Sequence, residues 1–293
     1  MSTCLIALGS NLGDRAATLD AAIADISSLR GMRLNRRSRW QATKPIGRGD
    51  NLHVFLNGAA LCETSLSPVE LLAALHGIEA RHGRQRTQRW ADRTLDLDVL
   101  LYDANVVDTP VLTIPHPRMS FRRFVLEPAV EIAGQLEHPT IGWTLDQLLR
   151  HLDIGADCLA VESPDAGRRA DVANVLITEF PGSIDVSQPD VDATQLWPAN
   201  LTTWLSIRRG ESVAQQSSAA AKHPKLTILL DPKITTARAD DEILNWTAIC
   251  RQKGRGPTLR IRSASWEEVS IESFAAVQAV WSALGPRCGE RLE

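Results

Sequence analysis

The sequence lacks the features of a disulfide-stabilised, membrane-spanning or nucleic-acid-binding protein. Its five cysteines, among 293 residues, include no C-x-x-C pair, which favours free thiols in a reducing compartment over disulfides or a zinc site. No apolar run reaches the roughly 18 residues of a membrane span, and the short run after Met1 lacks the basic start of a signal peptide. The net charge of -3 argues against broad binding to nucleic-acid phosphates. We therefore expect a cytoplasmic protein, with neither membrane nor nucleic acid among its partners.

The length indicates two domains or one large domain, and the first half has a readable order of elements. Helices are predicted after Asp14 and after Ser67-Pro68, which are favourable residues at helix starts. Apolar or alternating runs predict strands at 3–8, 34–40, 53–64 and 94–103. The order strand, helix, strand, strand, helix, strand is typical of a ferredoxin-like sandwich. The predicted fold class is therefore α+β, with a ferredoxin-like α/β sandwich as the N-terminal domain, at 1–165.

The composition shifts after residue 160 and predicts a second, small α/β domain at 168–293. We expect a connector at 164–171, strands at 172–180, 225–232 and 257–263, and helices at 240–254 and 270–284. FPGSID (180–185) follows the first of these strands, where a phosphate loop would lie, but no G-x-x-x-x-G-K-[ST] occurs anywhere in the chain. We interpret the domain as a degenerate, non-catalytic, kinase-like fold of unknown function and unknown protein partner.

Asp96 and Asp98 form the first candidate for chemistry. Two residues apart on a strand, their side chains share one face, about 6.5–7 Å apart along the chain. Carboxylates at that spacing can hold two hard cations. An edge strand with a solvated acidic face gives the same pattern, so the pair alone leaves two interpretations open.

Arginines concentrate just before this pair, and they favour a polyphosphate ligand. The planar guanidinium binds phosphate oxygens bidentately, and phosphoryl transfer needs such cations beside a metal. Basic residues at the end of a solvated helix are the alternative, which suits Arg81. The cluster comprises Arg81, Arg84, Arg86, Arg89 and Arg93.

A second group of residues indicates a further anion contact and a pocket for a flat ring. His116 lies between two prolines and is followed by Arg118, Arg122 and Arg123, so a structural turn and a phosphate contact are both possible. Phe55 and Phe124 would be ordinary core residues in isolation. Asn57 lies on the same strand face as Phe55, and a buried amide needs hydrogen-bond partners. Two rings and an amide edge would select a flat heterocycle.

Taken together, these segments resemble the 6-hydroxymethyl-7,8-dihydropterin pyrophosphokinase family over roughly residues 1–160. The resemblance rests on ALGSNLGD (7–14), TKPIG (43–47), FLNGA (55–59), IEARHGRQR (78–86), RWADRTLDLDVLLYD (89–103) and IPHPRMSFRRFVLEPAVEIA (114–133). It implies an enzyme of folate biosynthesis that moves pyrophosphate from ATP to the pterin and releases AMP. It also implies ATP as co-substrate and two Mg²⁺ ions.

The resemblance further implies a role for individual positions. Asp96 and Asp98 would hold the metal ions, and Asp98 would join Arg84, Arg86 and Arg93 among the catalytic residues. The pterin contacts would be Thr43, Ile46, Phe55, Asn57 and Phe124. The ATP contacts would be Glu79, Arg84, Trp90, Arg93, Val99, Thr113, His116 and Arg122.

The expected mechanism needs no covalent enzyme nucleophile. The hydroxymethyl oxygen of the pterin would attack the β-phosphorus of ATP, with positioning and electrostatics supplying most of the rate. Asp98 and a metal-bound water are the two candidates for the base. Two other classes of function remain open: a nucleotide-binding scaffold that keeps the fold without the reaction, and a fusion whose second domain tethers a partner.

Overall fold

The computed structural model divides the chain into two compact units. The N-terminal unit contains Met1–Pro139 and Thr144–Leu149, and the C-terminal unit contains Thr140–Trp143 and Arg150–Glu293. The structure describes residues 1–44, 53–84, 93–180, 184–186, 201–207, 223–231, 250, 252–253, 255–262 and 265–281. Among these residues, no helix combines the length and the apolar character that crossing a membrane requires.

The N-terminal unit mixes helix and sheet, as the sequence predicts. Its main strands are β1 (Ser2–Ser10), β2 (Met32–Arg37), β3 (Gln41–Thr43), β4 (Phe55–Thr64) and β5 (Asp96–Tyr102). Its helices are α1 (Arg15–Ser28), α2 (Pro68–Arg81), the short 3-10 helix η1 (Met119–Phe121) and α3 (Arg123–Ala133). A two-stranded ribbon pairs β6 (Val107–Asp108) with β7 (Thr113–Ile114), and α4 (Leu145–Ile154) follows at the division between the units.

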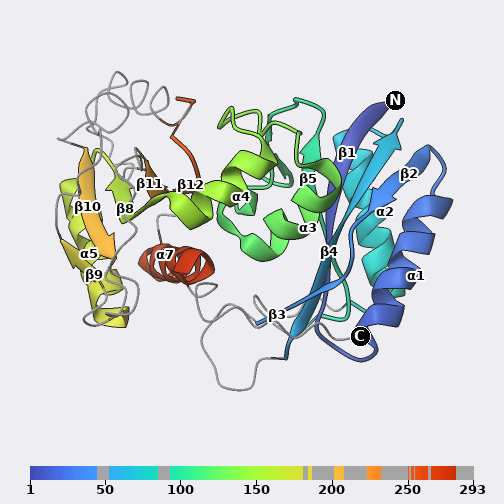
Figure 1. Cartoon of the computed structure of the whole chain (residues 1–293), viewed down its shortest axis with the longest axis horizontal. Coiled ribbons are helices and arrows are strands. Elements are labelled where there is room, and N and C mark those ends of the chain that lie inside the picture. The colour runs from blue at the N-terminus through green and yellow to red at the C-terminus, as the bar shows by residue number, and fades with distance from the viewer. Residues whose placement is uncertain are drawn as a thin grey trace. The chain divides into compact units, whose positions relative to one another are not determined.

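The large sheet runs in the order β2-β4-β1-β5, with β3 added to β4, and every pairing is antiparallel. Strands β1 and β5 are separated in sequence by two helices and three strands, yet they are neighbours, and β5 is the last strand in this order. Helices α1 and α2 cover one face of the sheet and α3 the other (Figure 1).

Local sequence explains where the first two helices begin. Asp14 caps α1, since its carboxylate accepts the Ala17 N–H at 3.0 Å. Ser67 and Glu70 form a reciprocal capping box at the start of α2. Both helices place apolar side chains against the sheet, in a buried core that includes Leu19, Ile26, Leu71, Leu75 and Ile78.

The C-terminal unit has a five-stranded sheet in the order β12-β11-β8-β10-β9. Its strands are β8 (Ala156–Glu162), β9 (Ile184–Val186), β10 (Thr202–Ile207), β11 (Pro224–Leu230) and β12 (Thr258–Ile261). Strand β11 runs parallel to both β8 and β12, whereas β10 is antiparallel to β8 and β9. Helices α5 (Ala166–Glu179) and α7 (Trp266–Trp281) pack together, with Phe180 stacked on Phe274 at 5.1 Å between ring centroids.

Two predictions for the second half are wrong. The connector expected at 164–171 and the strand expected at 172–180 both lie largely in helix α5. The run of apolar residues was misread because Val172, Ala173 and Leu176 also fit a helical face, and all three are buried.

Three other predictions for the second half are confirmed. The strands predicted at 225–232 and 257–263 and the helix predicted at 270–284 correspond to β11, β12 and α7. The helix predicted at 240–254 lies almost wholly outside the described residues. The limits 1–165 and 168–293 stay a prediction, and β8 already belongs to the second sheet.

Candidate active site

The acidic pair lies at the start of β5, on the strand face that the sequence predicts. Leu97 and Val99 are buried at 2% and 4% exposure, while the side chains of Asp96 and Asp98 are 23% and 45% exposed. The alternation of a two-residue period therefore turns both carboxylates away from the core. Strand β5 is held in this register by antiparallel pairing with β1, where Gly9 lies opposite Asp96 and Ala7 opposite Asp98.

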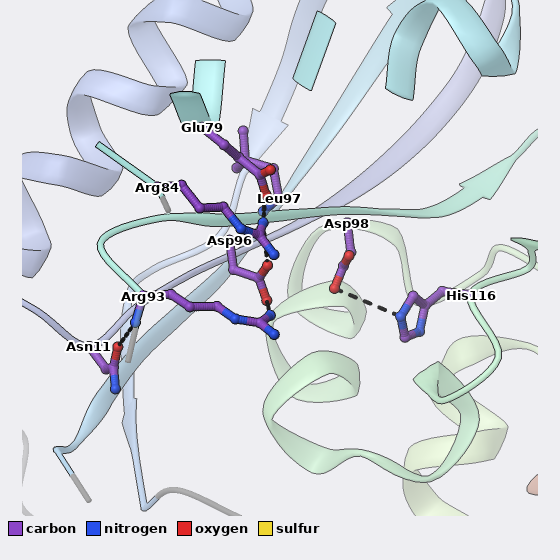
Figure 2. Close-up of polar contacts among 8 residues, drawn as sticks. All are labelled: Asn11, Glu79, Arg84, Arg93, Asp96, Leu97, Asp98 and His116. Atoms are coloured by element: carbon purple, nitrogen blue, oxygen red, sulfur yellow. Dashed lines mark hydrogen bonds and ion pairs between the residues drawn. The ribbon is translucent and has the colours of Figure 1, made fainter. Parts of the chain in front are cut away.

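Two arginines converge on Asp96. Arg84 Nη1 lies 2.7 Å from Asp96 Oδ1, and Arg93 Nη1 lies 2.7 Å from Asp96 Oδ2 (Figure 2). Arg84 follows α2, whereas Arg93 precedes β5, so the two guanidiniums reach one carboxylate from separate segments. This proximity of arginine and acid is the arrangement that the sequence pattern indicates.

Glu79 fixes the Arg84 side of this cluster. The Glu79 side chain is buried in the last turn of α2, where its Oε1 accepts the Leu97 N–H at 2.8 Å and pairs with Arg84 Nη1. One carboxylate oxygen thus joins helix α2, strand β5 and a guanidinium. A buried charge of this kind is stabilised by its cationic partner and its backbone donor.

Asp98 faces His116 from the other side of the cluster. The two side chains approach to 3.7 Å between Asp98 Oδ2 and His116 Nε2 (Figure 2). Burial, with the nearby charges of Arg122 and Arg118, lowers the pKa of His116 to about 3. His116 is therefore neutral at pH 7. Its Nδ1 accepts the Arg118 N–H at 3.2 Å, which assigns the ring proton to Nε2, on the side of Asp98.

The residues proposed to contact a flat ring come from β3, β4 and α3. Asn57 is 7% exposed, and its Nδ2 donates to Thr43 Oγ1 at 2.7 Å. Thr43 pairs with Phe55 in the sheet register. Gly9 lies opposite Asn57, where an added Cβ would come within 3.1 Å of the Asn57 Oδ1. Phe124 lies on α3, which packs against β4, and the Arg122 guanidinium lies 5.5 Å from the Phe124 ring centroid.

Other predicted residues lie in several different settings. Val99 packs in the hydrophobic core, Thr113 lies on β7, and Arg122 precedes the first turn of α3. Ile46, Arg86, Arg89 and Trp90 lie outside the described residues.

Sequence reasoning missed Asn11. This residue is 4% exposed, its Oδ1 accepts the Arg93 N–H at 2.6 Å, and its own N–H donates to the Arg93 carbonyl at 3.1 Å (Figure 2). Asn11 belongs to the segment GSNLGD (9–14) after the first predicted strand, and the glycines of this segment indicate a turn but not a contact with Arg93.

A cluster of carboxylates and guanidiniums on a mixed helix-and-sheet unit suits an enzyme that transfers phosphoryl groups. Residues 5–134 match the model of the 7,8-dihydro-6-hydroxymethylpterin-pyrophosphokinase (HPPK) family. The chain belongs to this family, a family of diphosphotransferase enzymes, as the relatives below show.

Three relatives illustrate the extent of the match. The 2-amino-4-hydroxy-6-hydroxymethyldihydropteridine pyrophosphokinase of Haemophilus influenzae is 45% identical over 139 residues, covering 47% of this chain and 86% of that protein. The Synechocystis protein of the same name is 38% identical over 152 residues, covering 52% and 77%. The folic acid synthesis protein fol1 of Schizosaccharomyces pombe is 35% identical over 147 residues, which are 50% of this chain and 20% of that protein. All three matches span about half of this chain.

Proposed function

We propose that the chain transfers pyrophosphate from ATP to 6-hydroxymethyl-7,8-dihydropterin, in a Mg²⁺-dependent reaction of folate biosynthesis that yields the pterin diphosphate and AMP. The observation that carries this proposal is the convergence of Arg84 and Arg93 on Asp96, with Asp98 beside it on the same strand. Paired carboxylates next to guanidiniums are what transfer of a charged phosphoryl group requires. The names of the relatives give the same reaction class.

Asp96 and Asp98 are the proposed holders of two Mg²⁺ ions. The donor set fits, because both are oxygen ligands on one strand face and Asp98 is 45% exposed. The described residues include no cluster of three or more potential ligands. Two carboxylates suit Mg²⁺, which keeps several waters and takes its remaining ligands from substrate phosphates. When bound, the ions would neutralise negative charge on the phosphate oxygens.

Arg84 and Arg93 are the proposed contacts of the transferred group, together with Arg86. In the structure, the Nη1 atoms of Arg84 and Arg93 each form an ion pair with Asp96. A guanidinium carries five N–H donors in a rigid fork, so nitrogens other than Nη1 can bind phosphate oxygens. The ion pair between Glu79 and Arg84 limits the rotamers that the Arg84 side chain can adopt.

The proposed pterin contacts are ordered by hydrogen bonding before any ring binds. The Asn57–Thr43 bond fixes which side of the Asn57 amide is the donor, so the acceptor Oδ1 has a defined direction. A fixed amide discriminates the edge of a heterocycle better than a mobile one. The flanking contacts proposed here are Ile46, Phe55 and Phe124.

The remaining proposed ATP contacts are Glu79, Trp90, Val99, Thr113, His116 and Arg122. His116 supports this role best, because a neutral imidazole with its proton on Nε2 offers a hydrogen-bond donor close to Asp98. We further propose that the N-terminal domain is a ferredoxin-like sandwich, a proposal that the strand order β2-β4-β1-β5 supports.

An AMP-release assay tests the proposal. Purified full-length protein with ATP and Mg²⁺ should release AMP only when hydroxymethyl-dihydropterin is added. Asp98→Asn keeps the size of the side chain but removes its charge, and should abolish both the release and the binding of Mn²⁺ measured by electron paramagnetic resonance. Asp171→Asn, on the exposed face of α5, is the matched control. Release of AMP independent of the pterin, or near-normal turnover by Asp98→Asn, would refute the assignment.

A further inference from the structure

Strands β2 and β3 pair with the same strand, β4, but in registers that differ by one residue. At the end of β2, Arg37 lies opposite Ala60, and at the start of β3, Gln41 lies opposite Asn57. Three residues lie between these pairs on one side, whereas only two lie between them on β4. An extra residue of this kind is a β-bulge, a feature that is over-represented next to active sites.

The bulge consists of Arg39 and Trp40, which together lie opposite Gly58. The preceding residue, Ser38, still follows the register of β2, because its N–H donates to the Ala59 carbonyl at 2.9 Å. Strand β3 then begins directly after Trp40. The change of register is therefore confined to these two positions.

Both residues of the bulge are held by helices of the N-terminal unit. The Arg39 backbone N–H donates to Glu131 Oε1 on α3 at 3.3 Å. The Trp40 indole N–H donates to Asp20 Oδ1 on α1 at 3.0 Å. Because α1 and α3 cover opposite faces of the sheet, the bulge is fixed from both sides (Figure 1).

Glycine at position 58 leaves room for the Trp40 side chain. A Cβ atom added to Gly58 would overlap the six-membered ring of the Trp40 indole. This ring packs against the hydrophobic core of the N-terminal unit, so it cannot move aside as the end of a flexible side chain can. A larger residue at position 58 would therefore displace Trp40 and disturb the bulge.

The shift of register decides on which face of the sheet the Thr43 side chain lies. With the bulge, Thr43 lies opposite Phe55 and shares the face of Phe55 and Asn57, so that Thr43 Oγ1 accepts from Asn57 Nδ2 at 2.7 Å. If β3 continued the register of β2, Thr43 would lie opposite Val54 and its side chain would point to the other face. The Asn57 amide would then lose this acceptor.

We infer that Trp40 and Gly58 are positioning residues for the proposed pterin site. The indole, packed on the only glycine of β4, holds the bulge that brings Thr43 to Asn57. Both residues act through the direction of the Asn57 amide, and neither is among the proposed pterin contacts. The inference rests on the proposed function, since it concerns residues proposed to contact the pterin.

NMR of the full-length protein labelled with 15N-asparagine tests the geometry without a ligand. The Asn57 side-chain amide is assigned by its absence from the spectrum of Asn57→Ala. Gly58→Ala and Trp40→Leu should each shift this resonance and make its hydrogen exchange several-fold faster, because the bond to Thr43 is weakened. Gly77→Ala, where an added Cβ would lie 4.0 Å from the nearest side chain, is the matched control and should change neither property. An unchanged Asn57 amide in both test variants would overturn the inference.

Kinetics of the same variants test the effect on the pterin. Gly58→Ala and Trp40→Leu should each raise KM for hydroxymethyl-dihydropterin about 10-fold, roughly the cost of one disturbed hydrogen bond, with little change in kcat or in KM for ATP. The double variant should be no worse than Trp40→Leu, since the added methyl group then meets no ring. Losses that multiply in the double variant, or an unaltered pterin KM in both single variants, would overturn the inference.

The double variant also decides the outcome if Gly58→Ala does not fold. A folded double variant with the pterin KM of Trp40→Leu would support the clash with the indole as the cause, whereas a double variant that also fails to fold would contradict it. Wild type that binds no pterin would refute the proposed function, while the asparagine spectra still test the bulge. Normal turnover with an unchanged Asn57 amide in Gly58→Ala would refute this inference alone.

Discussion

Asn11 holds the backbone of Arg93 by two hydrogen bonds, one accepted by its side chain at 2.6 Å and one donated by its own N–H at 3.1 Å. Arg93 lies three residues before Asp96, the first residue of β5, and its guanidinium pairs with that carboxylate. The loop after β1 and the segment before β5 are thereby joined at the candidate active site. Asn11 is thus a positioning residue, since it acts through Arg93.

Asn11→Ala should lower kcat by about 10- to 100-fold with a smaller change in KM, because a guanidinium displaced by a fraction of an ångström stabilises developing charge poorly. Asn11→Asp retains an acceptor for the Arg93 N–H and should recover most of the rate. Steady-state kinetics would measure both, with the exposed Asn35→Ala on β2 as control. An Asp variant as slow as the Ala variant would argue against the acceptor role.

Arg84→Ala should reduce kcat by about 100-fold and change KM for ATP less, because its charge is needed most where negative charge develops. Arg84→Lys should restore only part of the rate, since a point charge cannot serve Glu79, Asp96 and a phosphate together. Arg81→Ala, at an exposed site in the last turn of α2, is the matched control. Unchanged kcat in Arg84→Ala would remove this residue from the reaction.

Asn57→Ala should weaken pterin binding about 10- to 100-fold, the cost of one or two lost hydrogen bonds to a buried edge, and leave ATP binding unchanged. Isothermal titration with each ligand separately would show the difference. Thr43→Val removes the acceptor that orients the Asn57 amide and should give a smaller loss of the same kind. Equal losses for ATP and pterin would indicate damage to the sheet instead.

His151 should make the stability of the C-terminal unit depend on pH. Burial lowers its pKa to about 4, and its Nε2 lies 2.9 Å from the Pro224 carbonyl. Between pH 6.5 and 4, His151 binds a proton in the unfolded chain but not in the folded chain. The free energy of unfolding is therefore unaffected by the titration of this residue above pH 6.5, and it decreases as pH falls toward 4.

The test is thermal unfolding of wild type and His151→Gln from pH 7 to pH 4. Gln can donate to the same carbonyl but does not titrate, so the variant should lose less Tm over this range. The expected difference corresponds to at most about 1.4 kcal/mol per pH unit. Parallel curves for the two proteins would exclude His151 as the cause.

Much of the N-terminal unit followed from the sequence alone, since the information is local. Caps at Asp14 and Ser67 and a two-residue alternation around Asp96 are read within a few positions, and the structure confirms each of them. The same local reading failed at 172–180, where Val, Ala and Leu spacing fits both strand and helix. Helix α5 forms there because its buried face packs on the sheet, a long-range effect.

The sequence by itself determined which chemical groups are available: two carboxylates on one strand face, a cluster of arginines, and an amide beside aromatic residues. Only the tertiary structure decided which of them meet. Asn11 and Arg93 are 82 positions apart and come together because β1 and β5 are neighbours in the sheet.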